Sequence, residues 1–208
     1  MDSVDPGAYD DAALVISECQ HGILDPEAAL TPGVAREAAE RGVVERIARL
    51  AAAFRAAGRP VVHCHIAHRA DMAGMRRNSL PGAMAIKHGR MVAGTPDVAP
   101  PAELTPHAVD HVSTRAVGLT AFYGTDLDAT LRLRGVGTIV LTGVSTDVAV
   151  PGLALEAVNR GYWVQIPEDC VAGTSPGTHA FMMANLLPAL ARITDSARVL
   201  AGLGVPVA

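Results

Sequence analysis

The sequence has few aromatic residues, no block of basic residues and no long uninterrupted apolar run. Phe, Trp and Tyr make up 3% of the 208 residues, so few side chains are available to stack on nucleic-acid bases. The formal net charge is -4 and lysine and arginine are scattered, whereas nucleic-acid binding needs clustered basic residues that displace counterions. No uncharged apolar run is long enough to span a bilayer. We therefore expect neither nucleic acid nor a membrane as a partner.

Cysteine is also scarce, and its number gives no sign of a disulfide framework. Cys19, Cys64 and Cys170 are an odd number of thiols in a chain too large to need cross-links, so we expect reduced cysteines and a cytoplasmic protein. Half of the residues are hydrophobic and 18% are charged, which argues against a disordered chain. The length suits one large α/β domain, and we assign residues 1–208 to a single domain.

What the sequence does contain is a regular alternation of short β-type runs and longer helical runs. We predict strands at 12–19, 59–66, 109–115, 136–144, 162–170 and 192–194, and helices at 32–57, 124–135, 150–161, 176–191 and 195–203. The run at 136–144 is continuously apolar and rich in β-branched residues, as is typical of a central strand in a parallel sheet. The pattern predicts a three-layer α/β domain with a mostly parallel sheet, and a core that includes Val140, Leu141, Leu153 and Leu155.

Two places interrupt this alternation. Gly42 is expected to break the helical run at 32–57, because glycine weakens a helix interior. Residues 67–108 look irregular and contain five prolines. A segment of this length inside a compact domain is usually functional, so we interpret it as a lid or a binding loop; the alternative is a mobile surface excursion.

Polar side chains follow the ends of several predicted strands, where open α/β sheets bind ligands. Glu18 follows an apolar strand, so burial would raise its pKa and make it a usable general acid near neutral pH. The alternative is a glutamate that is simply paired with an arginine, and position alone favours neither. Arg115 is the obvious partner, because its permanent charge can hold a carboxylate or an anionic substrate group.

The segment "HCHIAH" supplies His63, His65 and His68 at the end of another predicted strand. Histidines at i and i+2 share a strand face, so a metal site is conceivable, with Asp71 near in sequence. The ligand set is incomplete, however, and polar residues at a cleft rim with one packed histidine are the preferred interpretation. We expect no metal and no cofactor. Cys19 and Cys64 have apolar neighbours and are expected to be inert buried thiols.

Several longer stretches resemble the isochorismatase-like cysteine hydrolase family. They are "ALVISECQ", "RPVVHCH", "TAFYGTDLDATLRLRGVGTIVLTGVSTDVAV" and "AVNRGYWVQIPEDCVAG", which together span most of the chain. The resemblance implies an open sheet of about six mostly parallel strands, a homo-oligomer, and a substrate pocket at the strand ends. It also implies a non-proline cis peptide near the catalytic helix, here between Val144 and Ser145.

The catalytic triad of this family, an aspartate, a lysine and a nucleophilic cysteine, does not carry over intact. The aspartate position holds Glu18 in "ECQ", the lysine position most nearly matches Arg115, and the cysteine position holds Ala149. The spacing from Arg115 to Phe122 is one residue longer than usual in the family. The resemblance implies that the substrate-binding residues are Gln20, Phe122, Ser145, Thr146 and Asp147.

Alanine has no nucleophile, so hydrolysis through a thioester is not expected. We predict instead a hydrolase that acts on a small, anionic metabolite, with Glu18 as general acid/base and Arg115 holding an anionic group. Glu18 should then lie in a pocket with Arg115, near Ala149 and the backbone of 145–149, where the helix start at 148–151 offers amides for an anion. Two alternatives remain: a non-catalytic descendant that binds a small molecule or another subunit, and a metal-assisted hydrolase that uses the histidines.

Overall fold

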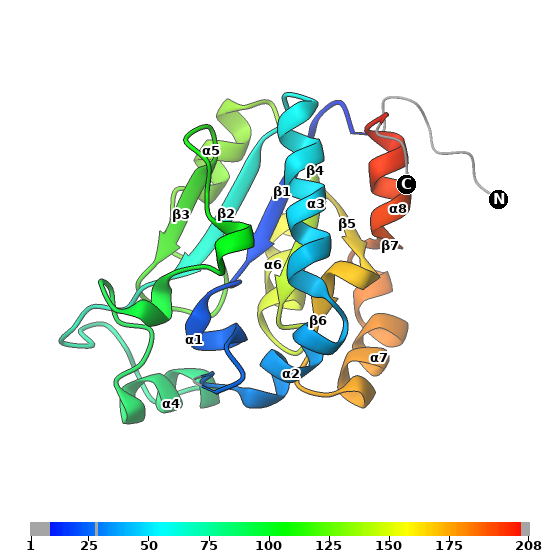
Figure 1. Cartoon of the computed structure of the whole chain (residues 1–208). Coiled ribbons are helices and arrows are strands. Elements are labelled where there is room, and N and C mark those ends of the chain that lie inside the picture. Colours follow the sequence, from blue (N-terminus) through cyan, green and yellow to red (C-terminus); the bar gives the residue numbers. More distant parts are fainter. Residues whose placement is uncertain (1–8, 28, 205–208) are drawn as a thin grey trace.

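The computed structural model describes residues 9–27 and 29–204; positions 1–8, 28 and 205–208 of the predicted domain lie outside the described residues. Within this part of the chain, a parallel sheet of seven strands forms the centre of the molecule (Figure 1). Its strands are β1 (Ala12–Ser17), β2 (Val61–Ile66), β3 (His111–Arg115), β4 (Thr138–Val144), β5 (Trp163–Pro167), β6 (Val171–Ala172) and β7 (Arg192–Thr194). The predicted α/β sandwich is confirmed, and the strand beyond the expected six is β6, which has two residues.

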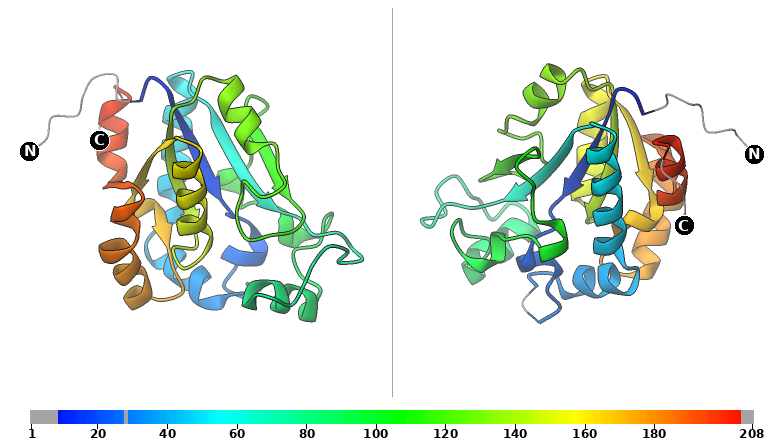
Figure 2. Two further views of the ribbon diagram at one scale, coloured as in Figure 1. Left: turned by 180° about the vertical axis from the view of Figure 1, so that it is seen from behind. Right: turned by 45° about the horizontal axis from the view of Figure 1, so that its top comes forward.

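Helices cover both faces of the sheet (Figure 2). Helices α2 (Pro32–Glu40), α3 (Val43–Ala56) and α8 (Ser196–Gly202) pack on one face, and α5 (Leu127–Leu133), α6 (Ala149–Asn159) and α7 (Pro176–Asn185) on the other. The remaining helical segments are α1 (His21–Leu24), α4 (Leu80–His88), η1 (Pro96–Val98), η2 (Ala102–Leu104), η3 (Glu168–Cys170) and η4 (Leu187–Ala189). Among the described residues, none of these helices has the length and apolar character that crossing a membrane requires.

The core lies in two layers, one on each side of the sheet. Every residue of β1 and β4 is buried, as a parallel sheet covered on both faces requires. Val140, Leu141 and Leu153 are fully buried, as predicted, but the prediction for Leu155 is wrong because that side chain is 49% exposed. Helix α6 turns the face that carries Leu153 and Ala157 toward the sheet, so a residue two positions after Leu153 faces outward.

The two predicted interruptions have different outcomes. Gly42 separates α2 from α3 in a left-handed conformation with φ of 61°, which confirms the break. The segment 67–108 is less irregular than expected, because residues 80–88 form α4. Ser79 accepts a hydrogen bond from the amide of Gly82 and Gly89 ends the helix with φ of 60°, and these are the residue types that begin and end helices.

The strand order β3-β2-β1-β4-β5-β7 places β1 where the chain changes direction across the sheet. From β1 the chain builds outward through β2 to β3, and then returns to the other side of β1 to form β4. The crevice beyond the carboxyl ends of two such strands is the usual ligand site of an open α/β sheet. Gly143 lets the strands approach closely there, since a Cβ at this position would lie 2.2 Å from the backbone oxygen of Ser17.

Candidate active site

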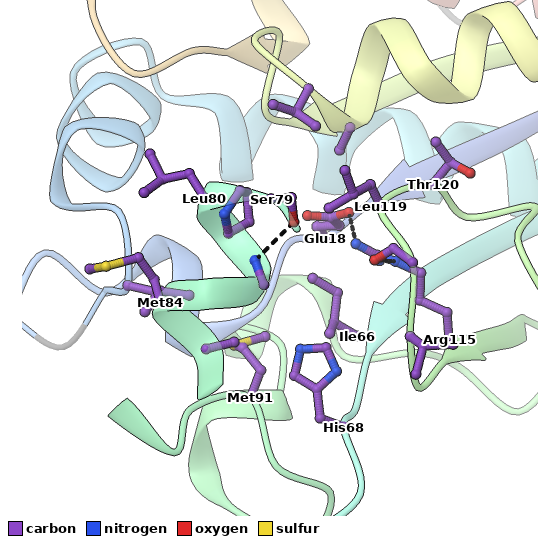
Figure 3. Close-up of a pocket in the computed structure, with 18 of the residues that line it drawn as sticks. Glu18, Ile66, His68, Ser79, Leu80, Met84, Met91, Arg115, Leu119 and Thr120 are labelled. Carbon is purple, nitrogen blue, oxygen red and sulfur yellow. Dashed lines mark hydrogen bonds and ion pairs between the residues drawn. The ribbon is translucent and has the colours of Figure 1, made fainter. Parts of the chain in front are cut away.

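The strand register brings the predicted site residues to one edge of the sheet. Ser17, at the end of β1, is paired with Cys64 in β2 and with Gly143 in β4. Ile66 at the end of β2 is paired with Arg115 at the end of β3. The chain therefore delivers Glu18, Arg115 and the 145–149 segment to the same side of the molecule, and Figure 3 shows Glu18 and Arg115 together there.

Glu18 has an unusual backbone conformation. Its φ is 55°, in the left-handed region that most residues other than glycine avoid. Its amide donates to the carbonyl of Cys64 at 2.9 Å, and its own carbonyl accepts from the amide of Gln20 at 2.9 Å. A residue held in a strained conformation at the end of a central strand is often part of a functional site.

Glu18 and Arg115 form a buried ion pair. The Nη2 atom of Arg115 lies 2.6 Å from Oε1 of Glu18, and their side chains are 5% and 11% exposed. Burial raises the pKa of Glu18, and the charge and hydrogen bond of Arg115 oppose this rise without cancelling it. The expected pairing with an arginine is therefore present, and the expected rise in the pKa of Glu18 accompanies it; the role of Glu18 as a general acid stays a prediction.

A large cavity opens next to this ion pair. It has a volume of about 960 Å³, and Glu18 and Arg115 are part of its lining. The segment 74–85 supplies one wall, which includes Met75, Leu80 and Met84 from α4 and the residues before it. Figure 3 shows Leu80 and Met84 on α4 across the cavity from Arg115. This placement supports the interpretation of the irregular segment as a binding loop.

The segment after β4 closes another side of the cavity. Ser145, Asp147 and Ala149 line it, and the peptide bond between Val144 and Ser145 is cis, as the resemblance implies. The Asp147 carboxylate accepts hydrogen bonds from the amide and the hydroxyl of Thr174, both at 2.8 Å. Asp147 is thereby tied to the neighbouring loop.

The start of α6 offers fewer free amides than the sequence suggested. The amides of Val148 and Val150 both donate to the carbonyl of Ser145, at 3.3 and 3.0 Å, and Pro151 has no N–H. Of residues 148–151, only Ala149 has an amide without an acceptor in the described part of the chain. The anion site expected at this helix start is therefore reduced to one donor.

The structure does not bring three of the expected substrate-binding side chains to the cavity. Gln20 is fully buried; its amide group donates to the carbonyls of Ile66 and Val98 and accepts from the amide of Ile66, so it fixes the backbone. Phe122 packs in the core and stacks on Tyr162.

Thr146 is the third of these side chains. It is fully buried, and its hydroxyl lies 3.4 Å from Nδ1 of His179. The sequence placed Gln20, Phe122 and Thr146 at the site because they belong to stretches that resemble the family. In the structure their side chains are buried next to the site and do not line the cavity.

The rings of His63 and His65 lie edge to face with their centroids 6.0 Å apart, whereas His68 makes different contacts. His63 bonds through Nε2 to Asp110 at 3.2 Å, and His68 bonds through Nδ1 to the carbonyl of Ala116 at 2.7 Å. Burial lowers the pKa of His65 to about 4, with a smaller contribution from His63. Among the described residues, no group of three or more metal-ligating side chains is arranged to hold an ion.

Of the three, only His68 lines the cavity. A carbonyl oxygen can only accept a hydrogen bond, so Nδ1 of His68 carries the hydrogen toward Ala116 and Nε2 is the acceptor. Burial lowers the pKa of His68, which keeps the ring uncharged. This placement agrees with the preferred interpretation of the segment as polar residues at the rim of a cleft, although the sequence did not indicate which of the three histidines lines it.

The cysteines are buried, as expected. Burial raises the pKa of Cys19 and of Cys64 to about 12 in each case, and it also raises the pKa of Cys170. None of the three lines the cavity, so the site contains no thiol.

Comparison with known proteins gives a consistent result. A model of the isochorismatase domain matches residues 12–198. The chain is 35% identical to "Uncharacterized isochorismatase family protein YecD" of Escherichia coli O157:H7, over 90% of this chain and 94% of that protein. It is 29% identical to "Ureidoacrylate amidohydrolase RutB" of Methylobacterium radiotolerans, over 97% of this chain and 84% of that protein. The crystal structure of an isochorismatase family protein from Desulfovibrio vulgaris superposes with a TM-score of 0.81 at 28% identity, covering 93% and 98% of the two chains.

Proposed function

Because the chain belongs to the isochorismatase family, we propose that it is a hydrolase that works without a cysteine nucleophile and uses Glu18 as its general acid/base. The observation that carries this proposal is the buried pair of Glu18 and Arg115 in the cavity wall. Ala149, at the position of the family nucleophile, lines the same cavity.

Other nucleophiles at the site are poorly placed. The buried cysteines hold their protons tightly, and a protonated thiol does not attack a carbonyl carbon. Ser145 reaches the cavity, but within the described residues its hydroxyl is not hydrogen bonded to a base that would activate it. Water is then the nucleophile, and it needs a base.

Glu18 fits both directions of proton transfer. As a carboxylate it accepts a proton from water while the water oxygen adds to a carbonyl carbon, and it returns that proton to the nitrogen or oxygen that leaves. As a carboxylic acid it protonates an enol ether, so that water can add to the activated carbon. A raised pKa brings both forms closer to neutral pH.

The surrounding groups have defined tasks in this proposal. Arg115 fixes the position of the Glu18 carboxyl through the 2.6 Å contact. The free amide of Ala149 donates to the oxygen that gains negative charge, which is the role of an oxyanion-hole donor. The relative RutB is named a ureidoacrylate amidohydrolase, which supports an amide-type bond as the bond that is hydrolysed.

The test begins with a metabolite screen by mass spectrometry that looks for depleted compounds, followed by kinetics of Glu18→Gln. This variant keeps the size of the side chain but transfers no proton, so we expect turnover to fall by ~10²–10⁴-fold while ligand binding persists. Glu103→Gln, at an exposed position outside the cavity, is the matched control and should retain turnover. Full turnover in Glu18→Gln would show that the carboxyl mechanism is wrong.

A second candidate is a protein that binds a small molecule without changing it. The direct contact between Arg115 and Glu18 favours it, because a paired carboxylate is less free to exchange protons. If the screen finds a tightly retained ligand and no depleted compound, this second candidate replaces the hydrolase.

A further inference from the structure

The size of the cavity bears on the class of substrate. Its volume of about 960 Å³ is at the upper end of the ~300–1,000 Å³ that ligand pockets usually have. A metabolite of a few atoms would leave most of this space filled with water. The cavity therefore fits a larger molecule than the small metabolite that the sequence suggested.

The charged groups in the lining largely cancel. Arg115 is paired with Glu18, whereas Asp147 keeps its negative charge, because its donor Thr174 is neutral. His68 is uncharged, as described above. The remaining cation, Arg76, is exposed to solvent, where water screens its charge. The lining thus gives little reason for an anionic substrate to leave water.

Most of the remaining wall is apolar. Its side chains come from α1, α2, α4, the last residue of β2 and the neighbouring loops: Ile23, Leu30, Val34, Ile66, Met75, Leu80, Met84, Met91, Val117, Leu119, Tyr123 and Val148. Methionine side chains adapt to apolar ligands of different shapes, and Met84 is only half-buried, so it has room to move. This wall stabilises a hydrocarbon or aromatic body by removing it from water.

The polar end of the cavity offers a small set of hydrogen-bonding groups. The Nη1 atom of Arg115 is buried without a hydrogen-bond partner in the described residues, and a buried donor without an acceptor is costly. The Ala149 amide is a second donor, and Nε2 of His68 is an acceptor. A carbonyl oxygen beside an N–H group would match donors and an acceptor of this kind.

We propose that the substrate is an uncharged and mainly apolar molecule that carries one amide-type head group, such as the amide of an aromatic or medium-chain aliphatic acid. The head group lies at Glu18, Arg115 and His68, and the apolar body lies against α4 and Leu119. This inference rests on the proposed function for the position of the reacting bond, but the apolar wall that carries it is independent of any catalytic step.

The experiment combines binding and turnover on the same panel of compounds. Binding is measured as displacement of the neutral fluorescent probe N-phenyl-1-naphthylamine, and turnover as ammonia release from acetamide, butyramide, hexanamide, 4-phenylbutyramide and the anionic half-amide succinamate. We expect the probe to bind saturably and hexanamide to displace it. Each added methylene should raise kcat/KM, or tighten binding, by about fourfold. This factor corresponds to the free energy of transferring one CH₂ group from water to an apolar site.

A matched pair of variants tests the wall itself. Met84→Glu places a charge in the apolar wall, and we expect it to weaken probe binding and the preference for hexanamide over acetamide by about tenfold or more. Leu133→Glu adds the same charge at a position that is 89% exposed and outside the cavity, and should change neither. If Met84→Glu does not fold, Met84→Lys and the displacement series on the wild type decide the question.

The outcomes separate this inference from the proposed function. Displacement by hexanamide without any ammonia release supports the apolar ligand class and overturns the hydrolysis of apolar primary amides, and the metabolite screen then decides whether the protein is a hydrolase. Turnover of succinamate or acetamide in preference to hexanamide, abolished by Glu18→Gln, supports the hydrolase and overturns the inference. Absence of saturable probe binding also overturns the inference.

Discussion

Removing either partner of the Glu18–Arg115 pair should destabilise the protein strongly, and the two losses should depend differently on pH. The two side chains are almost fully buried and their charged atoms are 2.6 Å apart. For unit charges about 4 Å apart at an effective dielectric constant of about 20, the attraction is about 4 kcal/mol. Breaking one side of a buried pair typically costs about 3–5 kcal/mol, because the other charge stays buried.

The partner that remains decides the pH dependence. In Glu18→Gln the remaining group is an arginine, which cannot lose its proton, so its unpaired charge stays buried at every pH in the ordinary range. In Arg115→Met the remaining group is Glu18, and the pKa of this carboxyl, already raised by burial above 4.5, rises further without the guanidinium. A carboxyl group with a raised folded-state pKa stabilises the protein most below its unfolded pKa. It loses that contribution as the pH rises through the folded value.

Urea unfolding followed by circular dichroism, at about pH 5 and about pH 8, measures both free energies of unfolding. The free energy of unfolding of Arg115→Met should be closer to that of the wild type at about pH 5 than at about pH 8. The free energy of unfolding of Glu18→Gln should change less than that of Arg115→Met between these two pH values. Arg69→Met is the control, because the Arg69–Asp71 pair has a similar distance of 2.7 Å but lies on the surface; its stability should not change measurably. A loss below about 1 kcal/mol for both buried variants, or an identical loss for Arg115→Met at both pH values, would refute the reasoning.

Three further predictions concern the thiols, the histidines and assembly. Burial raises the pKa values of Cys19 and Cys64 to about 12, so these thiols should not react with Ellman's reagent in the native protein. A variant with serine at all three cysteine positions that stays folded should keep turnover within a few-fold of the wild type. Burial lowers the pKa of His65 and of His179 to about 4. As the pH decreases, the unfolded chain therefore binds protons before the folded protein does, and the free energy of unfolding should fall between about pH 6.5 and about pH 4. Replacing both histidines by glutamine should make this fall, measured by urea unfolding, less steep. Light scattering at micromolar concentration should show a homo-oligomer, and a monomeric wild type would contradict this expectation. Phe181 is 62% exposed on α7. If α7 lies in the interface between subunits, Phe181→Glu should lower the measured mass.

The sequence predicted the fold better than it predicted the walls of the site. Strands such as β4 carry a continuous apolar signal, and the order of strands and helices leaves few alternatives for their arrangement. The helix α4 was missed because its apolar residues line an open cavity instead of a continuous core, so they show no strong periodicity. The stretch from Ser79 to Gly89 did contain capping residues at both ends, and these could have indicated the helix.

Among the site residues, the sequence predicted strand-end positions well and side-chain directions less well. Glu18 and Arg115 could be placed because each lies at the end of a strand, whereas Ala149 was placed through the resemblance to the family. Gln20 and Thr146 lie beside them in sequence, but whether such a side chain faces the cavity depends on the left-handed turn at Glu18 and the turn after Ser145. The histidine segment was expected at a cleft rim, but only the structure shows that His68 lines the cavity while its Nδ1 contacts the carbonyl of Ala116.

The backbone conformation of Glu18 also limits how this position can change by mutation. Single-nucleotide changes in a glutamate codon lead to aspartate, glycine, alanine, valine, glutamine or lysine. A φ of 55° is tolerated by glycine and by aspartate, and strongly disfavoured by the β-branched valine. Aspartate is the single one of these replacements that keeps a carboxyl group and also suits the backbone. The backbone at this position therefore makes exchange between the two acidic residues the easiest evolutionary path.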